Sequence, residues 1–187
     1  LEPRAFFPSL LMLFLAITLG GILSFITLFG RSVGITNVGW FFLANAAMVA
    51  LVRPIAGVLF DRKGHAWVLL PGAFFSIIGL LLLSYATQIS SLMISAMFYG
   101  AGFGAIQPSL HAWTINRVPL ERRGAANATF LSSLDLGIGL GAMLLGIVAD
   151  ATSYAQMYRW SSLLMVAYLV IYAAYLWKQR RRLPDAR

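Results

Sequence analysis

The sequence contains six apolar runs, each long enough for a helix to cross a bilayer. A crossing helix needs about 20 apolar residues, because it rises about 1.5 Å per residue. The connectors between the runs are too short to hold a soluble domain. We therefore predict a single all-α membrane domain of six transmembrane helices. The predicted spans are residues 9–29, 38–60, 66–86, 91–115, 125–149 and 158–177.

Composition supports lipid as the solvent. Hydrophobic residues make up 60% of the 187 and charged residues 11%, whereas soluble domains carry about 25% charged residues. The chain has no cysteine, which excludes disulfides and thiolate metal sites. The net charge of +8 comes from short loops between apolar runs, a membrane pattern rather than a nucleic-acid one. We expect no cofactor, no metal and no nucleic-acid partner.

The placement of Lys and Arg predicts the orientation, because cytoplasmic loops are enriched in both. Most of the 14 basic residues fall on one side of the predicted membrane. We expect that side to be cytoplasmic, with both termini there, a basic tail at 178–187, and a bacterial plasma membrane as the location. The basic residues on that side are Arg4, Arg62, Lys63, Arg117, Arg122, Arg123, Lys178, Arg180, Arg181, Arg182 and Arg187.

The loop after the second run carries the most specific motif. Residues 53–64 read Arg-Pro-Ile-Ala-Gly-Val-Leu-Phe-Asp-Arg-Lys-Gly. This stretch resembles the Gly-x-Leu-x-Asp-Arg-x-Gly signature that the major facilitator superfamily carries between its second and third helices. The basic residues that usually follow are replaced by His65 and Ala66, a departure that suits the weaker copy in the C-terminal half. The matching positions are Gly57, Leu59, Asp61, Arg62 and Gly64.

The resemblance implies half of a twelve-helix fold that moves small solutes by alternating access. Residues 135–141 also resemble the fifth or eleventh helix of many members. A start at Leu1 and the absence of a span after the basic tail favour helices seven to twelve, so the expected partner is an N-terminal six-helix half. Similar endings at 57–61 and 146–150, three spans apart, predict a three-plus-three inverted repeat.

The motif loop is a candidate gate formed by Gly57, Asp61, Arg62 and Gly64. Gly57 permits close approach of another helix, and Asp61 offers a negative charge to a helix N-terminus. Contacts of this kind form in one conformation and break in another. The alternative is a plain turn with basic anchors.

Asp135 is the one acidic residue well inside a span, about 18 Å from Arg123 along a helix. An ionised carboxylate there costs about 2.5–3.5 kcal/mol on insertion scales. The Asp135 carboxyl must therefore be protonated, paired with a cation, or in contact with water. We predict that it exchanges a proton during transport, with Arg53 at comparable depth as its partner. The alternatives are a structural ion pair for Asp135 and snorkelling to the headgroups for Arg53.

Polar residues in two spans are candidate cavity residues. Gln107 and His111 are four apart and share a helix face, and Asn45 is a weaker candidate. Helix–helix hydrogen bonding is the alternative for all three.

Glycine pairs spaced by four predict close helix packing. They are Gly100 with Gly104 and Gly137 with Gly141. The second pair is also predicted to slide against the other half. Tryptophans near span ends, Trp113 among them, are predicted to lie at the membrane interfaces.

These features favour a secondary transporter, and proton-coupled export is the preferred version. Uptake by symport is an alternative. A six-span intramembrane enzyme is less favoured, because the two histidines, His65 and His111, lack a Gly-x-Ser-x-Gly partner. A half of an ATP-driven pump is disfavoured because no nucleotide-binding domain is visible. The expected partners are a small solute, protons and the bilayer.

Overall fold

Six long helices account for almost all of the residues that the computed structural model describes, 2–181. Within that range there is no β-strand, and each helix is long and apolar enough to cross a membrane. This confirms the predicted all-α fold of six helices able to span a membrane, and every helix begins and ends within four residues of a predicted span. The helices are α1 (Phe6–Ser32), α2 (Gly39–Lys63), α3 (Ala66–Ser84), α4 (Ile89–Asn116), α5 (Arg123–Ala151) and α6 (Tyr154–Arg181), with one-turn helices η1 (Pro3–Ala5) and η2 (Leu120–Arg122).

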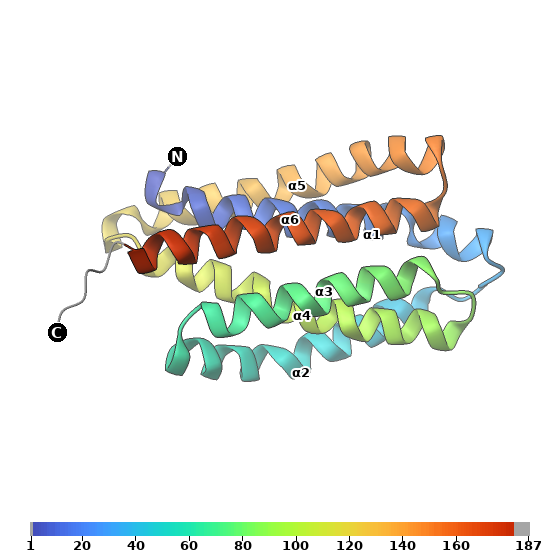
Figure 1. Cartoon of the computed structure of the whole chain (residues 1–187), viewed down its shortest axis with the longest axis horizontal. Helices are drawn as coiled ribbons and strands as arrows, with labels where there is room; N and C mark the ends of the chain where they lie inside the picture. The colour runs from blue at the N-terminus through green and yellow to red at the C-terminus, as the bar shows by residue number, and fades with distance from the viewer. Residues whose placement is uncertain (1, 182–187) are drawn as a thin grey trace.

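Successive helices run in alternating directions along one long axis (Figure 1). The start of α1, the α2–α3 turn, the α4–α5 turn and the end of α6 therefore share one end of the bundle. We call this the basic end, because Arg4, Arg62, Lys63, Arg117 and Arg122 lie there. The first four residues of the predicted tail continue α6, and residues 182–187 lie outside the described range.

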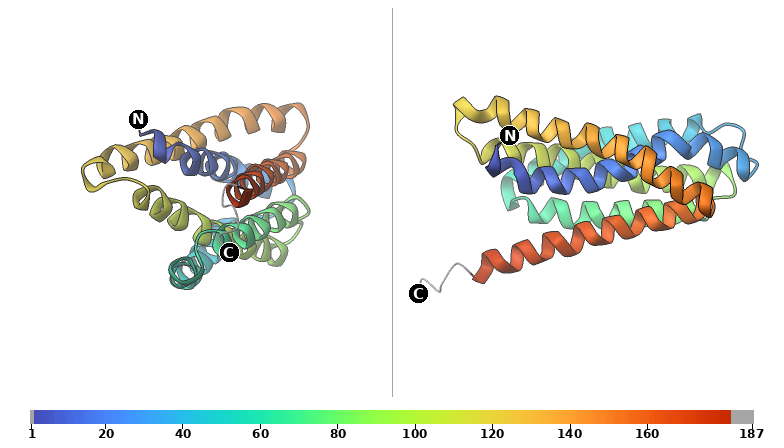
Figure 2. Two further views of the ribbon diagram at one scale, coloured as in Figure 1. Left: turned by 60° about the vertical axis from the view of Figure 1, so that its left-hand side comes forward. Right: turned by 90° about the horizontal axis from the view of Figure 1, so that it is seen from above.

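The helices α2 and α5 form opposite edges of the bundle (Figures 1 and 2). The main packing partner of α5 is α1, and that of α2 is α4, while α6 packs on α3 and α1. Within the described residues α2 and α5 do not contact each other. Only Phe41, Ala44 and Ala56 are buried along α2, so this edge helix leaves most of its surface uncovered by the chain.

In a three-plus-three repeat, α1 corresponds to α4 and α2 corresponds to α5. The packing of α1 on α5 and of α4 on α2 fits this correspondence. The inverted repeat itself stays a prediction.

Small residues set the closest helix approaches. A Cβ on Gly141 would overlap the backbone carbonyl oxygen of Ile17 in α1, and one on Gly137 would overlap Ala16. On the other side of the bundle, a Cβ on Gly100 would lie 2.7 Å from the carbonyl oxygen of Asn45 in α2. Such close approach is how helices associate in lipid, where apolar side chains gain little from leaving the tails.

The glycine face of α5 is therefore used inside the bundle. Gly137 and Gly141 are buried against α1, whereas a Cβ on Gly139 would meet nothing within 4 Å. The prediction that the Gly137–Gly141 face slides against another half is wrong in this structure, because α1 already occupies that face.

Candidate functional site

Arg53 and Asp135 lie at similar depths on the two edge helices. Asp135 is twelve residues after Arg123, about 18 Å from the start of α5, and Arg53 is ten residues before Lys63, about 15 Å from the end of α2. Both side chains are exposed on the surface of the isolated chain. The sequence-based prediction rests on the same counting, so the depth of these two residues in a membrane stays a prediction.

Arg53 and Asp135 do not pair with each other in this structure. Their helices make no contact, and the one ion pair among the side chains that the structure describes joins Glu2 to Arg122. The expected neutralisation of Arg53 by Asp135 is therefore absent, because equal depth does not make two helices neighbours. Each charge instead faces outward from its edge of the bundle.

Two of the three candidate cavity residues take part in helix–helix contacts. The Asn45 amide donates to the carbonyl oxygen of Ala96 in α4 over 3.4 Å. His111 Nε2 lies 2.7 Å from the Asn127 side-chain oxygen of α5, and its ring packs on Phe130 at a centroid distance of 5.1 Å. Gln107, one turn before His111, is half-buried.

The motif loop forms a sharp turn at the C-terminal end of α2. Gly64 has a φ of 83°, a conformation that glycine adopts without steric cost, and its N–H donates to the Phe60 carbonyl over 2.8 Å. Asp61 and Arg62 are exposed. A Cβ on Gly57 would meet nothing within 4 Å, so the face of α2 that carries the motif is open in this chain.

The residue after the motif is held by an aromatic cluster that the sequence did not reveal. His65 stacks on Trp113 of α4, and its Nδ1 shares a hydrogen bond with the Tyr172 hydroxyl of α6. Trp113 is buried, which corrects its prediction as a membrane-interface residue. The His65 cluster, as we name it, comprises Phe7, His65, Trp113, Arg117, Tyr172 and Tyr175.

Burial of His65 in this cluster lowers the pKa of its imidazole, and the nearby Arg117 guanidinium lowers it further. Arg117 lies 5.1 Å from the Trp113 ring centroid and donates to the Tyr175 hydroxyl over 3.3 Å. Neutral His65 is thus the form that the cluster accommodates.

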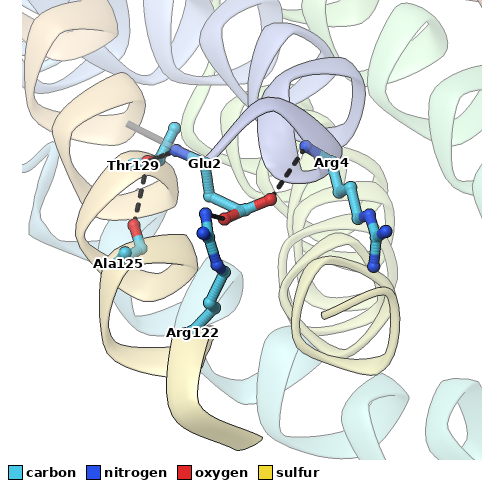
Figure 3. A network of polar contacts seen from close by, with 5 residues as sticks. All are labelled: Glu2, Arg4, Arg122, Ala125 and Thr129. Carbon is cyan, nitrogen blue, oxygen red and sulfur yellow. Dashed lines mark hydrogen bonds and ion pairs between the residues drawn. The ribbon is translucent and has the colours of Figure 1, made fainter. Parts of the chain in front are cut away.

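A second network at the basic end ties the start of the described chain to α5 (Figure 3). The Glu2 carboxylate is buried and accepts from Arg122 over 3.1 Å, a contact that lowers the Glu2 pKa. The Glu2 N–H donates to Thr129 over 3.2 Å, and Thr129 donates to the Ala125 carbonyl. Apart from an isolated acidic residue before the first span, no sequence pattern indicated this network.

The chain is similar in sequence to known membrane transporters. A family model described as Major Facilitator Superfamily matches residues 6–187. An uncharacterized MFS-type transporter, MJ1560 of Methanocaldococcus jannaschii, is 26% identical over 153 residues, covering 81% of this chain and 39% of that protein. The staphylopine export protein of Staphylococcus aureus is 22% identical over 167 residues, covering 87% of this chain and 42% of that protein.

A solved structure has the same helix arrangement. The crystal structure of peptide transporter POT in complex with sulfate superposes with a TM-score of 0.77 at 18% identity. The match covers 91% of this chain and 37% of the POT chain. The chain thus spans about two fifths of the length of these relatives.

Proposed function

Because this chain belongs to the major facilitator superfamily, we propose that it forms the C-terminal half of a transporter that moves a small solute by alternating access. The observation that carries the proposal is the pair of uncovered edge helices with exposed charges at membrane depth, Arg53 on α2 and Asp135 on α5. A charge facing lipid at this depth is costly. The two edges therefore meet protein or water, as they do if a second six-helix half packs against them.

In this proposal Asp135 couples transport to protons. Its carboxyl lies about 18 Å along α5 from the basic end, on a side that this chain leaves open. A carboxyl so placed is reached from one side of the membrane and then the other as two halves rock. Arg53, unpaired with Asp135 here, is proposed to meet a group of the other half.

The gate is proposed to use the open face of α2. Gly57 leaves room beside the helix, and the exposed Asp61 and Arg62 stand at its end. Contact of this face with the other half in one conformation only would make the motif loop a gate. The basic end is proposed to face the cytoplasm of a bacterial cell.

The proposed direction is export in exchange for protons. Its support is the similarity to a staphylopine export protein together with the membrane-depth carboxyl of Asp135.

Reconstitution tests this function. The full-length protein is placed in proteoliposomes, a proton gradient is imposed in either direction, and the flux of a panel of small solutes is measured against protein-free liposomes. We expect at least one solute to move against its gradient only when protons move the opposite way. Solute movement in the same direction as protons would contradict export by antiport. A solute flux that is the same with and without the proton gradient would contradict proton coupling.

A further inference from the structure

Among the residues that the structure describes, Arg53 is the one basic residue deep inside a long helix. Every other Lys or Arg there lies within six residues of the end of a long helix, whereas Arg53 lies ten residues before the end of α2. It is exposed on this chain and takes no part in the ion pair between Glu2 and Arg122. A guanidinium stays charged and has five N–H donors but no acceptor, so it needs an acceptor group beside it.

The packing of α2 on α4 places Gln107 level with Arg53. A Cβ on Gly104 of α4 would lie 2.9 Å from the Cα of Val49 in α2, so the two backbones touch there. Both helices run in the same direction (Figure 1), so one turn further along each come Arg53 and Gln107. Counting agrees, because Gln107 lies nine residues before the end of α4, about 14 Å, and Arg53 about 15 Å before the end of α2.

Arg53 and Gln107 also lie on the same side of the contact between α2 and α4. Met48 and Ile55 line a groove between α2 and α3. At about 100° per residue, Arg53 is turned about 140° from Met48 and about 160° from Ile55, so it faces away from α3. Gln107 shares a face of α4 with His111, which meets α5 on that same side.

The Gln107 carboxamide is available for a ligand. The other polar residues on this side, Asn45 and His111, already form hydrogen bonds within the chain. Gln107 is half-buried, and its side chain forms no hydrogen bond with any residue that the structure describes. Its N–H donors add to those of Arg53, so the pair offers donors from two helices at one depth.

Apolar surface borders the pair. Phe103, one turn before Gln107 on α4, is half-buried. Leu131 of α5, one turn after the asparagine that binds His111, is 43% exposed. A ligand whose anionic end lies at Arg53 would therefore find apolar side chains for the rest of its body.

We propose that Arg53 and Gln107 bind the carboxylate of a transported organic acid with an apolar body; this inference rests on the proposed transport function. The guanidinium fork donates to both carboxylate oxygens, and the Gln107 amide donates to one of them. A single cation balances a single negative charge, which favours a carboxylate over a phosphate monoester with a charge of about −1.5 to −2. Because Arg53 has five donors, it can contact this solute and the other half of the transporter together.

A comparison of acids with their neutral amides tests the site. The full-length protein in micelles is titrated with hexanoate, N-acetylleucine and indoleacetate, and with hexanamide, N-acetylleucinamide and indoleacetamide. Binding is measured as the rise of the thermal unfolding midpoint with ligand concentration. We expect at least one acid to bind more tightly than its amide. Arg53→Gln and Gln107→Leu should each weaken binding of that acid about tenfold, the worth of one hydrogen bond to a charged group.

Two matched controls remove the same groups far from the site. Arg31→Gln and Gln156→Leu, at exposed positions near the other end of the bundle, should bind the acid as wild type does. Arg53→Lys keeps the charge but loses the fork, so it should still prefer the acid while binding it more weakly; this variant decides the question if Arg53→Gln fails to fold.

Three results would overturn the proposal. They are equal binding of every acid and its amide, a preference for the acid that survives Arg53→Gln, and equal weakening by Arg53→Gln and Arg31→Gln. Because binding is measured without a gradient, failure here is distinct from failure of the transport function. Acid-selective binding with a flux unaffected by protons would support the site and contradict proton coupling. Proton-coupled flux that carries acid and amide alike would contradict the site alone.

Discussion

The imidazole of His65 stacks on the indole of Trp113, with the ring centroids 4.2 Å apart and the ring planes inclined by 21°. This contact joins the residue directly after the motif loop to α4, and the hydrogen bond to Tyr172 joins it to α6. The loop is thus fixed to its own bundle at its base. Its exposed part, Asp61 and Arg62, would move with the bundle as a rigid body.

The first prediction concerns the pH dependence of this anchor. The pKa of His65 is lowered in the folded protein, whereas an unfolded histidine titrates at about 6.5. The unfolded state therefore binds more protons below that pH, and stability is full above about 6.5 and falls as the pH drops below it. We expect the thermal unfolding midpoint of the full-length protein to fall between pH 7.5 and 5.5. His65→Phe keeps the stacking but cannot be protonated, so its midpoint should fall less over the same range. Equal slopes for the two proteins would show that His65 is not the titrating group.

The second prediction concerns the contact between α1 and α5. Gly141→Ala places a methyl group against the Ile17 backbone, which cannot rotate away, and should destabilise the protein by about 1–3 kcal/mol. Gly139→Ala points into open space and should be neutral or stabilising by up to about 1 kcal/mol. Denaturant unfolding in micelles measures both. Similar losses for the two variants would contradict the packing described for α5.

The third prediction concerns the gate. Gly57→Leu meets no other part of this chain, so expression and membrane insertion should match wild type. The added side chain fills the face proposed to meet the other half. Solute flux in proteoliposomes should therefore fall at least about tenfold, which corresponds to an increase of about 1.4 kcal/mol in the activation barrier. Val58→Leu, a neighbouring exposed position, should transport normally. Normal flux through Gly57→Leu would refute the gate.

The six spans were predictable because each must cross the same hydrocarbon thickness, which fixes a minimum apolar length. Four helices, α1, α4, α5 and α6, extend past both predicted ends because hydropathy marks the apolar part only; α6, for example, continues to Arg181. The depth of Arg53 and Asp135 in the membrane follows only from counting residues along a helix, so it stays a prediction. Which helices lie side by side could not be predicted from the sequence, so only the structure shows that Arg53 and Asp135 are on helices that make no contact.

The two networks at the basic end were not predictable from local pattern. Glu2 and Arg122 are 120 residues apart, and His65 and Tyr172 are 107 apart. Only helix packing brings such pairs together. The one available hint was that His65 stands where the family usually has a basic residue, which marks a changed environment but not its partners.

The most direct test of proton-coupled alternating access is the effect of Asp135→Asn on solute flux driven by a proton gradient. The full-length protein, this variant and Asp150→Asn are reconstituted in parallel; Asp150 is exposed at the far end of the same helix and controls for loss of a carboxylate. We predict that Asp135→Asn abolishes gradient-driven flux while Asp150→Asn retains it. Undiminished proton-driven flux through Asp135→Asn would contradict the account.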